Sequence, residues 1–301
     1  MARKNKDNSS TIADFFDRTA ANLRGSGNAV SLLAMASCVV CAIAMLAIGV
    51  PRLRNYLNER SFVEAGAVTV RFVDAPVWFD RTRAAEIRAL VATAVGDGSA
   101  LDPTRLVAAR EALTQSGWFS AIKQVRLDDN GGFLIDAVFR HPFAVVLHAN
   151  REHLVDENGC RLPADWALGQ RPSEPHWISL VNATSPPPGA PGERWAGRDV
   201  AAGLELLKTT FGKPWERQIA AIDLSRMDGD GLVLLTTNGG FIMWGYPPDV
   251  ETTAEPPKTA KLRNLDVLFA STGHIDNGGG RVLDLRTDVP SVRLVSDEAP
   301  R

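Results

Sequence analysis

The residues best suited to chemistry in this sequence are a few histidines and acidic side chains. His153 and Asp156 lie close together and can be imagined as a proton relay between an imidazole and a carboxylate. The same stretch also predicts a plain turn, because Asp156-Glu157-Asn158-Gly159 separates two apolar runs and Asn-Gly favours a tight hairpin. We therefore interpret Asp156 as a turn residue.

Motifs for metal, phosphate or nucleophilic chemistry are missing from the sequence. None of the five histidines falls in an HExxH or other metal-ligand pattern (His141, His148, His153, His176 and His274). There is no G-x-S-x-G and no P-loop. The run 228–231, Asp-Gly-Asp-Gly, lacks the third acidic position and the terminal Glu of a calcium loop, and the three glycines 278–280 predict a flexible loop. We expect no enzyme activity, no catalytic, cofactor-binding or metal-binding residue, no cofactor and no small-molecule substrate.

The amino-acid composition excludes several classes of protein. The chain has 301 residues, with 33 Lys and Arg against 35 Asp and Glu and a net charge of -2. This near-neutral balance argues against a nucleic-acid-binding protein, which normally carries a basic face. Hydrophobic residues make up 45% of the chain, so it is not a disordered acidic segment, and 3 cysteines cannot form a multi-bridge framework.

One uncharged run, residues 29–50, is long enough to cross the roughly 30 Å hydrocarbon core of a bilayer as a helix. A cleaved signal peptide is the alternative, but its apolar region is normally only about 7–15 residues long. Five basic residues precede the run (Arg3, Lys4, Lys6, Arg18 and Arg24) and three follow closely (Arg52, Arg54 and Arg60). The positive-inside rule thus places the N-terminus in the cytoplasm. We predict a cytoplasmic tail over 1–28, a transmembrane helix over 29–50 and a connector over 51–67.

Residues 68–142 predict a small α+β module. Alternating apolar residues indicate a strand over 68–76, and two amphipathic stretches then indicate helices, the first from Asp80 to Gly96 and the second beginning at Asp102-Pro103. Two further strands flank a turn at Asn130-Gly131. The order is strand, helix, helix, strand, strand.

Residues 143–295 predict a mostly antiparallel β domain with flanking helices, followed by a tail over 296–301. We expect two strands around the turn at 156–159, helices over 200–212 and 258–273, and a hairpin over 231–245 whose tip is Asn238-Gly239. Residues 281–294 are expected to form one terminal strand, with Pro290 placing a bend or an edge within it.

The order of elements over 68–142, and the phrase SGWFSAIKQVRL within it, resemble the POTRA (polypeptide-transport-associated) domain, where Trp118 fits an aromatic before the second strand. A POTRA-like module behind one membrane helix, followed by three short motifs, resembles the FtsQ/DivIB family of bacterial division proteins over about residues 29–295. The motifs are Leu154-Val155-Asp156 with Gly159, Lys261-Leu262, and Asp284-Leu285-Arg286.

The resemblance implies a binding edge at the end of the chain. In that family the region after "DLR" accepts a strand from the small coiled-coil division protein FtsB. The corresponding residues here are Arg286, Thr287, Val289, Ser291, Val292, Arg293 and Leu294. Better-known members carry aromatics where Thr287 and Leu294 stand here, and Pro290 removes a backbone donor, so the interface differs or is weaker. A strand that merely closes the sheet is the alternative, and for Arg286 a salt bridge with Asp284 is the expected role.

The function that follows is a membrane-anchored, non-enzymatic scaffold of the division machinery. By resemblance it binds FtsB/FtsL-like membrane proteins, contacts lipid through one helix, and lies in the cell (inner) membrane at the septum with its large C-terminal part extracytoplasmic. One alternative is a POTRA-containing protein that handles polypeptides in secretion or envelope assembly, although repeated modules and a barrel are not found. Another is an anchored envelope hydrolase using His153 or Asp156.

Overall fold

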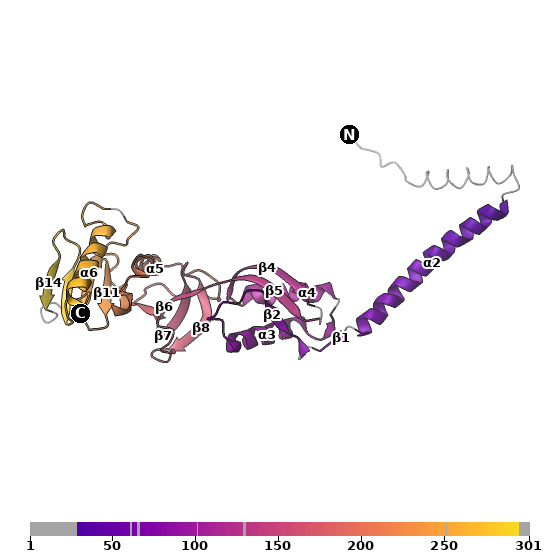
Figure 1. Cartoon of the computed structure of the whole chain (residues 1–301), viewed down its shortest axis with the longest axis horizontal. Helices are drawn as coiled ribbons and strands as arrows, with labels where there is room; N and C mark the ends of the chain where they lie inside the picture. The colour runs from indigo at the N-terminus through magenta and orange to yellow at the C-terminus, as the bar shows by residue number, and fades with distance from the viewer. Residues whose placement is uncertain are drawn as a thin grey trace, which may run out of the picture. The chain divides into compact units, whose positions relative to one another are not determined.

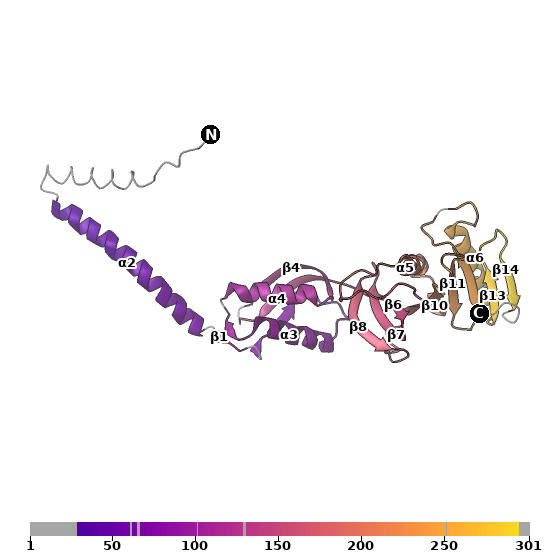
Figure 2. The same cartoon turned by 180° about the vertical axis from the view of Figure 1, so that it is seen from behind.

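The computed structural model describes residues 29–60, 62–64, 67–100, 102–128, 131–250 and 252–294. It is a mixed α+β protein with one N-terminal apolar helix and a large part built mostly of sheet (Figures 1 and 2). The chain forms two compact units, residues 1–63 with 99–102 and residues 64–98 with 103–301. The tails expected over 1–28 and 296–301 and the turn residue Asn130 lie outside the described residues.

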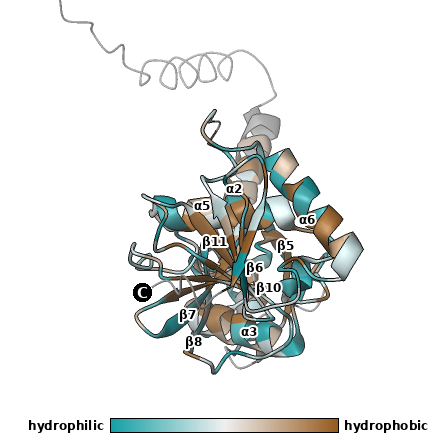
Figure 3. Ribbon diagram, turned by 90° about the vertical axis from the view of Figure 1, so that its left-hand side faces the viewer, coloured by the Kyte–Doolittle hydropathy of each residue, from teal (hydrophilic) through white to brown (hydrophobic). Residues whose placement is uncertain are grey.

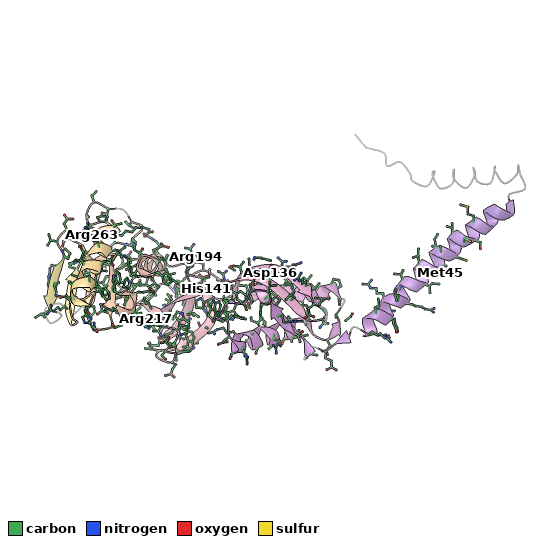
Figure 4. The ribbon with its side chains drawn as sticks, in the orientation of Figure 1. Met45, Asp136, His141, Arg194, Arg217 and Arg263 are labelled. Carbon is green, nitrogen blue, oxygen red and sulfur yellow. The ribbon has the colours of Figure 1, made fainter. Side chains whose placement is uncertain are left out.

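The N-terminal helix α2 spans Ala29–Arg60 and contains a stretch, Met35–Leu57, that is long and apolar enough to cross a membrane. Its side chains are exposed along this stretch, as Met45 shows in Figure 4. We expected the helix to end before Pro51, but it continues ten residues further, to Arg60. A proline is tolerated inside such a helix, and the Arg, Leu and Glu residues after it favour helix, so the predicted connector begins later.

The second unit begins with a three-stranded sheet and two helices. The strand order is β2-β5-β4, with β2 parallel and β4 antiparallel to β5. This confirms the predicted order of strand, helix, helix, strand, strand. The bounds are β2 Val70–Phe72, α3 Arg81–Val95, α4 Pro103–Gln115, β4 Phe119–Leu127 and β5 Phe133–Phe139. A separate two-stranded sheet is formed by β1 (Phe62–Val63), which belongs to the first unit, and β3 (Gly98–Ser99).

The two helices begin and end at the expected residues. The side chain of Asp80 accepts a hydrogen bond from the Arg83 N–H at 2.9 Å, which caps α3, and Pro103 occupies the first position of α4. Aromatic rings then fill the space between helices and sheet, among them Phe79, Phe119 and Trp118, each less than a tenth exposed. Trp118 is thus a core residue, as predicted.

A nine-stranded sheet follows, in the order β14-β13-β12-β11-β10-β9-β6-β7-β8. Five of its eight pairings are antiparallel and three are parallel, so the prediction of a mostly antiparallel sheet is confirmed. The strands are β6 Pro142–His148, β7 Arg151–Asp156, β8 Arg161–Ala167, β9 Ile178–Val181, β10 Ile219–Asp223, β11 Leu232–Thr236, β12 Phe241–Gly245, β13 Arg281–Asp284 and β14 Ser291–Leu294.

Two helices cover one face of this sheet. Helix α5 (Arg198–Thr210) links the parallel pair β9 and β10, and helix α6 (Lys258–Thr272) links the parallel pair β12 and β13. Strands β10 and β12 run in the same direction, and both connections step toward β14. Because such crossovers are right-handed, both helices must lie on the same face. One core cluster accordingly contains Leu204 and Leu207 from α5 with Leu265 from α6, beside the apolar strands in Figure 3.

A single row of side chains crosses all nine strands on this covered face. Residues directly opposite one another in adjacent strands point to the same face of a sheet. The six central members are aliphatic and 0–3% exposed. The row runs Val292, Leu283, Ile242, Leu234, Ile222, Leu180, Val146, His153 and Asp165. We refer to these nine residues as the cross-strand row.

Three strand predictions for this region need correction. The stretch expected to form two strands around the turn at 156–159 forms three, because Ala149 and Asn150 adopt positive φ and make a second tight turn. Strand β9 was missed because it has only four residues, too few for a clear alternating pattern. Residues 281–294 form two paired strands instead of one, with the chain reversing between Leu285 and Pro290. The predicted hairpin of β11 and β12 and both helices are confirmed.

A buried carboxylate holds the start of α5 in place. Asp199 is 5% exposed and accepts hydrogen bonds from the N–H and hydroxyl groups of Thr184 and Ser185 and from the Val200 N–H, at 2.7–3.3 Å. Burial alone would raise the pKa of Asp199, but these hydrogen bonds lower it below its usual value. The carboxylate therefore ties the loop after β9 to the helix that covers the sheet.

Replacing Asp199 tests this role. Asp199→Ala leaves several buried donors without an acceptor, and we expect the free energy of unfolding to fall by about 3 kcal/mol. Urea denaturation of the full chain in detergent measures it. Glu205→Ala on the same helix is the control: its ion pair with Lys208 is exposed, so the loss should stay below about 1 kcal/mol. Equal losses in the two variants would contradict this assignment.

Candidate functional site

The candidate site is the outer edge of the nine-stranded sheet, formed by the hairpin of β13 and β14. Strand β14 pairs antiparallel with β13, placing Ser291 opposite Asp284 and Val292 opposite Leu283. Because β14 stands last in the strand order, its outer backbone groups face no strand among the described residues. Such groups form a ready-made template for pairing with another chain.

Exposure of side chains increases along the cross-strand row toward this edge. Ile242 is 0% exposed, Leu283 is 3% exposed and Val292 is 42% exposed, and Leu294, on the same face of β14, is 58% exposed. Helices α5 and α6 thus cover the middle of the row and leave its end at β14 accessible to water. Val289, in the turn before β14, is 79% exposed. The edge therefore combines open backbone groups with an apolar strip.

The remaining predicted site residues divide into two groups. Ser291 and Arg293 lie on the opposite face of β14, since their partners in register are Asp284 and Val282. Thr287 belongs to the turn, where its hydroxyl donates to the Val289 carbonyl at 2.9 Å. The structure places all of these residues in one hairpin, but only Val289, Val292 and Leu294 offer exposed apolar surface.

Arg286 is held inside the hairpin by charge. Its Nε and Nη2 atoms donate to both oxygens of Asp284 at 3.0 and 2.8 Å, and its Nη1 donates to Asp230 at 3.0 Å. The expected salt bridge with Asp284 is confirmed. Asp230 is a partner that sequence reasoning missed, because it lies 56 positions away in another loop. Arg286 therefore positions the turn of the hairpin.

The electrostatics of this cluster follow from its geometry. Burial would raise the pKa of Asp284, but hydrogen bonds from the Arg286 side chain and backbone lower it below its usual value. The side-chain hydrogen bond with Asp284 in turn raises the pKa of Arg286. Both groups are charged at neutral pH, and the turn is anchored by a bidentate ion pair.

The opposite edge of the sheet is partly closed. Arg161 in β8 donates its N–H to the Glu193 carbonyl at 2.9 Å, and its carbonyl accepts from the Gly192 N–H at 2.7 Å. Pro163, also in β8, carries no N–H to donate. The two edges are thus unequal, and the β14 edge is the one left open to a partner.

His153 and Asp156 do not form the proton relay that their spacing in the sequence suggested. His153 Nδ1 lies 2.9 Å from an oxygen of Asp165, whereas Asp156 accepts from Arg140 at 2.8 Å and from the N–H groups of Asn158 and Cys160. Asp156 is thus a turn residue, as predicted. Burial, followed by the charge of Asp156, raises the pKa of the nearby Cys160 thiol, which keeps it protonated at neutral pH.

The two other motifs weighed in the sequence also have structural roles. Asp230, in the run 228–231, forms ion pairs with Arg226 and Arg286. The glycine run 278–280 is not a loose loop, because Asp276 accepts the N–H groups of Gly278 and Gly279 and the hydroxyl of Thr236. Among the described residues, no group of three or more His, Cys, Asp or Glu side chains could hold a metal ion.

No protein-family model and no curated protein matches this chain.

The Asp284–Arg286 pair predicts a pH effect. A carboxyl whose pKa is lowered on folding stabilises the protein above its unfolded pKa, here 3.8, and loses that contribution as pH falls through the folded value. We expect Asp284→Asn to cost about 1 kcal/mol of unfolding free energy at neutral pH, and the difference from wild type to disappear once the pH falls below the lowered pKa of the folded state.

Denaturation of the full chain at a series of pH values measures this effect. Asp249→Asn is the control, because Asp249 is exposed and forms no hydrogen bond or ion pair with the described residues. A difference between Asp284→Asn and wild type that persists unchanged in acid would show that the ion pair does not stabilise the hairpin.

Proposed function

We propose that this protein is a membrane-anchored, non-enzymatic scaffold of the bacterial division machinery, similar to FtsQ/DivIB. Helix α2 anchors it in the cell (inner) membrane with the N-terminus cytoplasmic and the sheet-rich part extracytoplasmic. Its action is to hold other single-pass division proteins, of the FtsB and FtsL kind, at the septum.

Support for the family comes from the order of elements. A helix long enough to span a membrane precedes the β2-α3-α4-β4-β5 unit, which has the element order of a POTRA domain. The nine-stranded sheet follows, and it carries the motifs 154–159, 261–262 and 284–286 at β7, α6 and the end of β13. We propose that the β2-α3-α4-β4-β5 unit is a POTRA-like module that contacts partners near the membrane.

The observation that carries the proposal is the uncovered end of the cross-strand row. A strand added beside β14 would satisfy its outer N–H and C=O groups, and the added side chains would bury Val292 and Leu294. Backbone pairing supplies affinity without needing a deep pocket. The anchored helix adds to it, because partners confined to the same membrane meet at high effective concentration and modest contacts suffice.

Localisation and depletion test the cellular role. A fluorescent fusion of the full chain should collect at the septum during constriction, and depletion should produce filaments or unseparated cells. A fusion spread evenly around the cell would contradict the proposal. A defect in envelope composition with normal division would instead indicate polypeptide handling in secretion or envelope assembly.

Substitutions at the edge test the binding site. The double variant Val292→Lys with Leu294→Lys places two charges on the strip a partner strand must cover, and we expect at least about tenfold weaker co-purification of the FtsB-like partner. Leu168→Lys is the control: Leu168 is 52% exposed and follows β8, the strand at the other end of the strand order. Undiminished co-purification by the double variant would rule out β14 as the docking strand.

A further inference from the structure

A surface hollow is formed by residues between Trp78 and Trp177, none of which belongs to the β13–β14 hairpin. It has a volume of about 610 Å³ and lies within the second compact unit. Its walls come from the start of α3, from the segment between β5 and β6 that carries His141 (Figure 4), and from the loop between β8 and β9. The principal apolar surfaces are two indole rings and three proline rings: Trp78, Trp177, Pro142, Pro172 and Pro175.

Most polar groups around this hollow already have partners. The Trp78 indole N–H donates to His141 Nε2 at 3.3 Å. Asp80 accepts from the backbone and side chain of Arg83, whose guanidinium also lies 5.5 Å from the centre of the Trp118 ring. These groups shape the walls, while Arg83 Nε and Nη2 and His141 Nδ1 form no hydrogen bond with the described residues.

Two further lining side chains, Trp177 and Glu174, form no hydrogen bond or ion pair with the described residues. Trp177 is 7% exposed, and its ring stacks on that of Trp166, with 5.9 Å between the ring centres. Its indole N–H donates to no described residue and remains accessible to solvent. Glu174 is exposed and forms no ion pair or hydrogen bond in the described part of the chain. The hollow therefore offers one indole donor and one carboxylate between flat apolar walls.

We infer that this hollow binds a proline-rich peptide segment that carries a basic residue. A polyproline II segment has no internal hydrogen bonds, so its carbonyl groups are free to accept from an indole N–H. Its rings pack well in aromatic-lined grooves, and because it is already extended it loses little entropy on binding. Here the rings pack against Trp78 and Trp177, one carbonyl accepts from Trp177 Nε1, and an Arg or Lys side chain pairs with Glu174.

The charge of the hollow selects the basic residue. Asp80 and Arg83 neutralise each other at 3.0 Å, which leaves the carboxylate of Glu174 as the unbalanced charge. A glycan is the other ligand that stacks on tryptophan. The unbalanced charge of Glu174 favours a peptide with a basic residue, because a cation can pair with this carboxylate and a neutral glycan cannot.

Titration of the full chain in lipid nanodiscs tests the inference. The probe is a synthetic oligoproline peptide with one central arginine, compared with the same peptide carrying glutamate, and calorimetry measures the dissociation constant. We expect binding on the order of 10–100 µM for the arginine peptide and at least about threefold weaker binding for the glutamate peptide.

Two variants separate the contributions. Glu174→Gln should weaken the arginine peptide about threefold and remove the preference over glutamate. Trp177→Phe keeps a ring but deletes the N–H, and it should weaken both peptides about fivefold. Glu157→Gln, an exposed acid in the turn after β7, is the matched control and should leave binding unchanged.

Three results would overturn the inference. They are no binding of either peptide, wild-type binding by both Glu174→Gln and Trp177→Phe, and binding of an N-acetylglucosamine oligomer in place of the peptides. Thermal unfolding checks that each variant is folded. If Trp177→Phe is not, Glu174→Gln decides alone, because its side chain is on the surface and its loss leaves the core intact.

Discussion

The nine-stranded sheet depends on the cross-strand row that is buried beneath α5 and α6. Six aliphatic side chains of the row are almost fully excluded from water, and a slip of one residue in any strand would turn its member to the opposite face. The row therefore sets the register of the six central strands in which its members are buried. It also requires both crossover helices to lie on one face, which their right-handed connections already ensure.

The two ends of this row differ in chemistry. At one end the row finishes in a polar pair, His153 hydrogen-bonded to Asp165, and the β8 edge beside it is partly covered by the chain around Gly192 and Glu193. At the other end it finishes in Val292 on an edge that no described strand covers. Charges and prolines are the usual means of blocking edge-to-edge pairing; here the one charge in β14, Arg293, lies on the opposite face of the strand from Val292, and Pro290 precedes the strand.

Buried charge in this protein stabilises structure. Asp199 secures the start of α5, and Lys261, 3% exposed, binds Glu255 at 2.6 Å and so fastens α6 to the loop that precedes it. Arg286 and Asp284 fix the last turn of the sheet. Each of these charged groups holds a helix or turn that covers or extends the cross-strand row. The charged side chains named here therefore position the backbone.

Local sequence was enough to predict elements whose signals lie within a few residues. The length of the apolar run indicated α2, Asp80 and Pro103 marked the helix starts, and Asn238-Gly239 marked a hairpin, because caps and tight turns depend on nearby backbone geometry. The Asp284–Arg286 ion pair could likewise be predicted, because the two residues are neighbours in the sequence. Strand β9, the division of 281–294 into two strands, the partner Asp230 and the exposure of Val292 were decided by the tertiary structure. These features depend on which distant strands become neighbours and on how far the covering helices extend, and no local pattern encodes either.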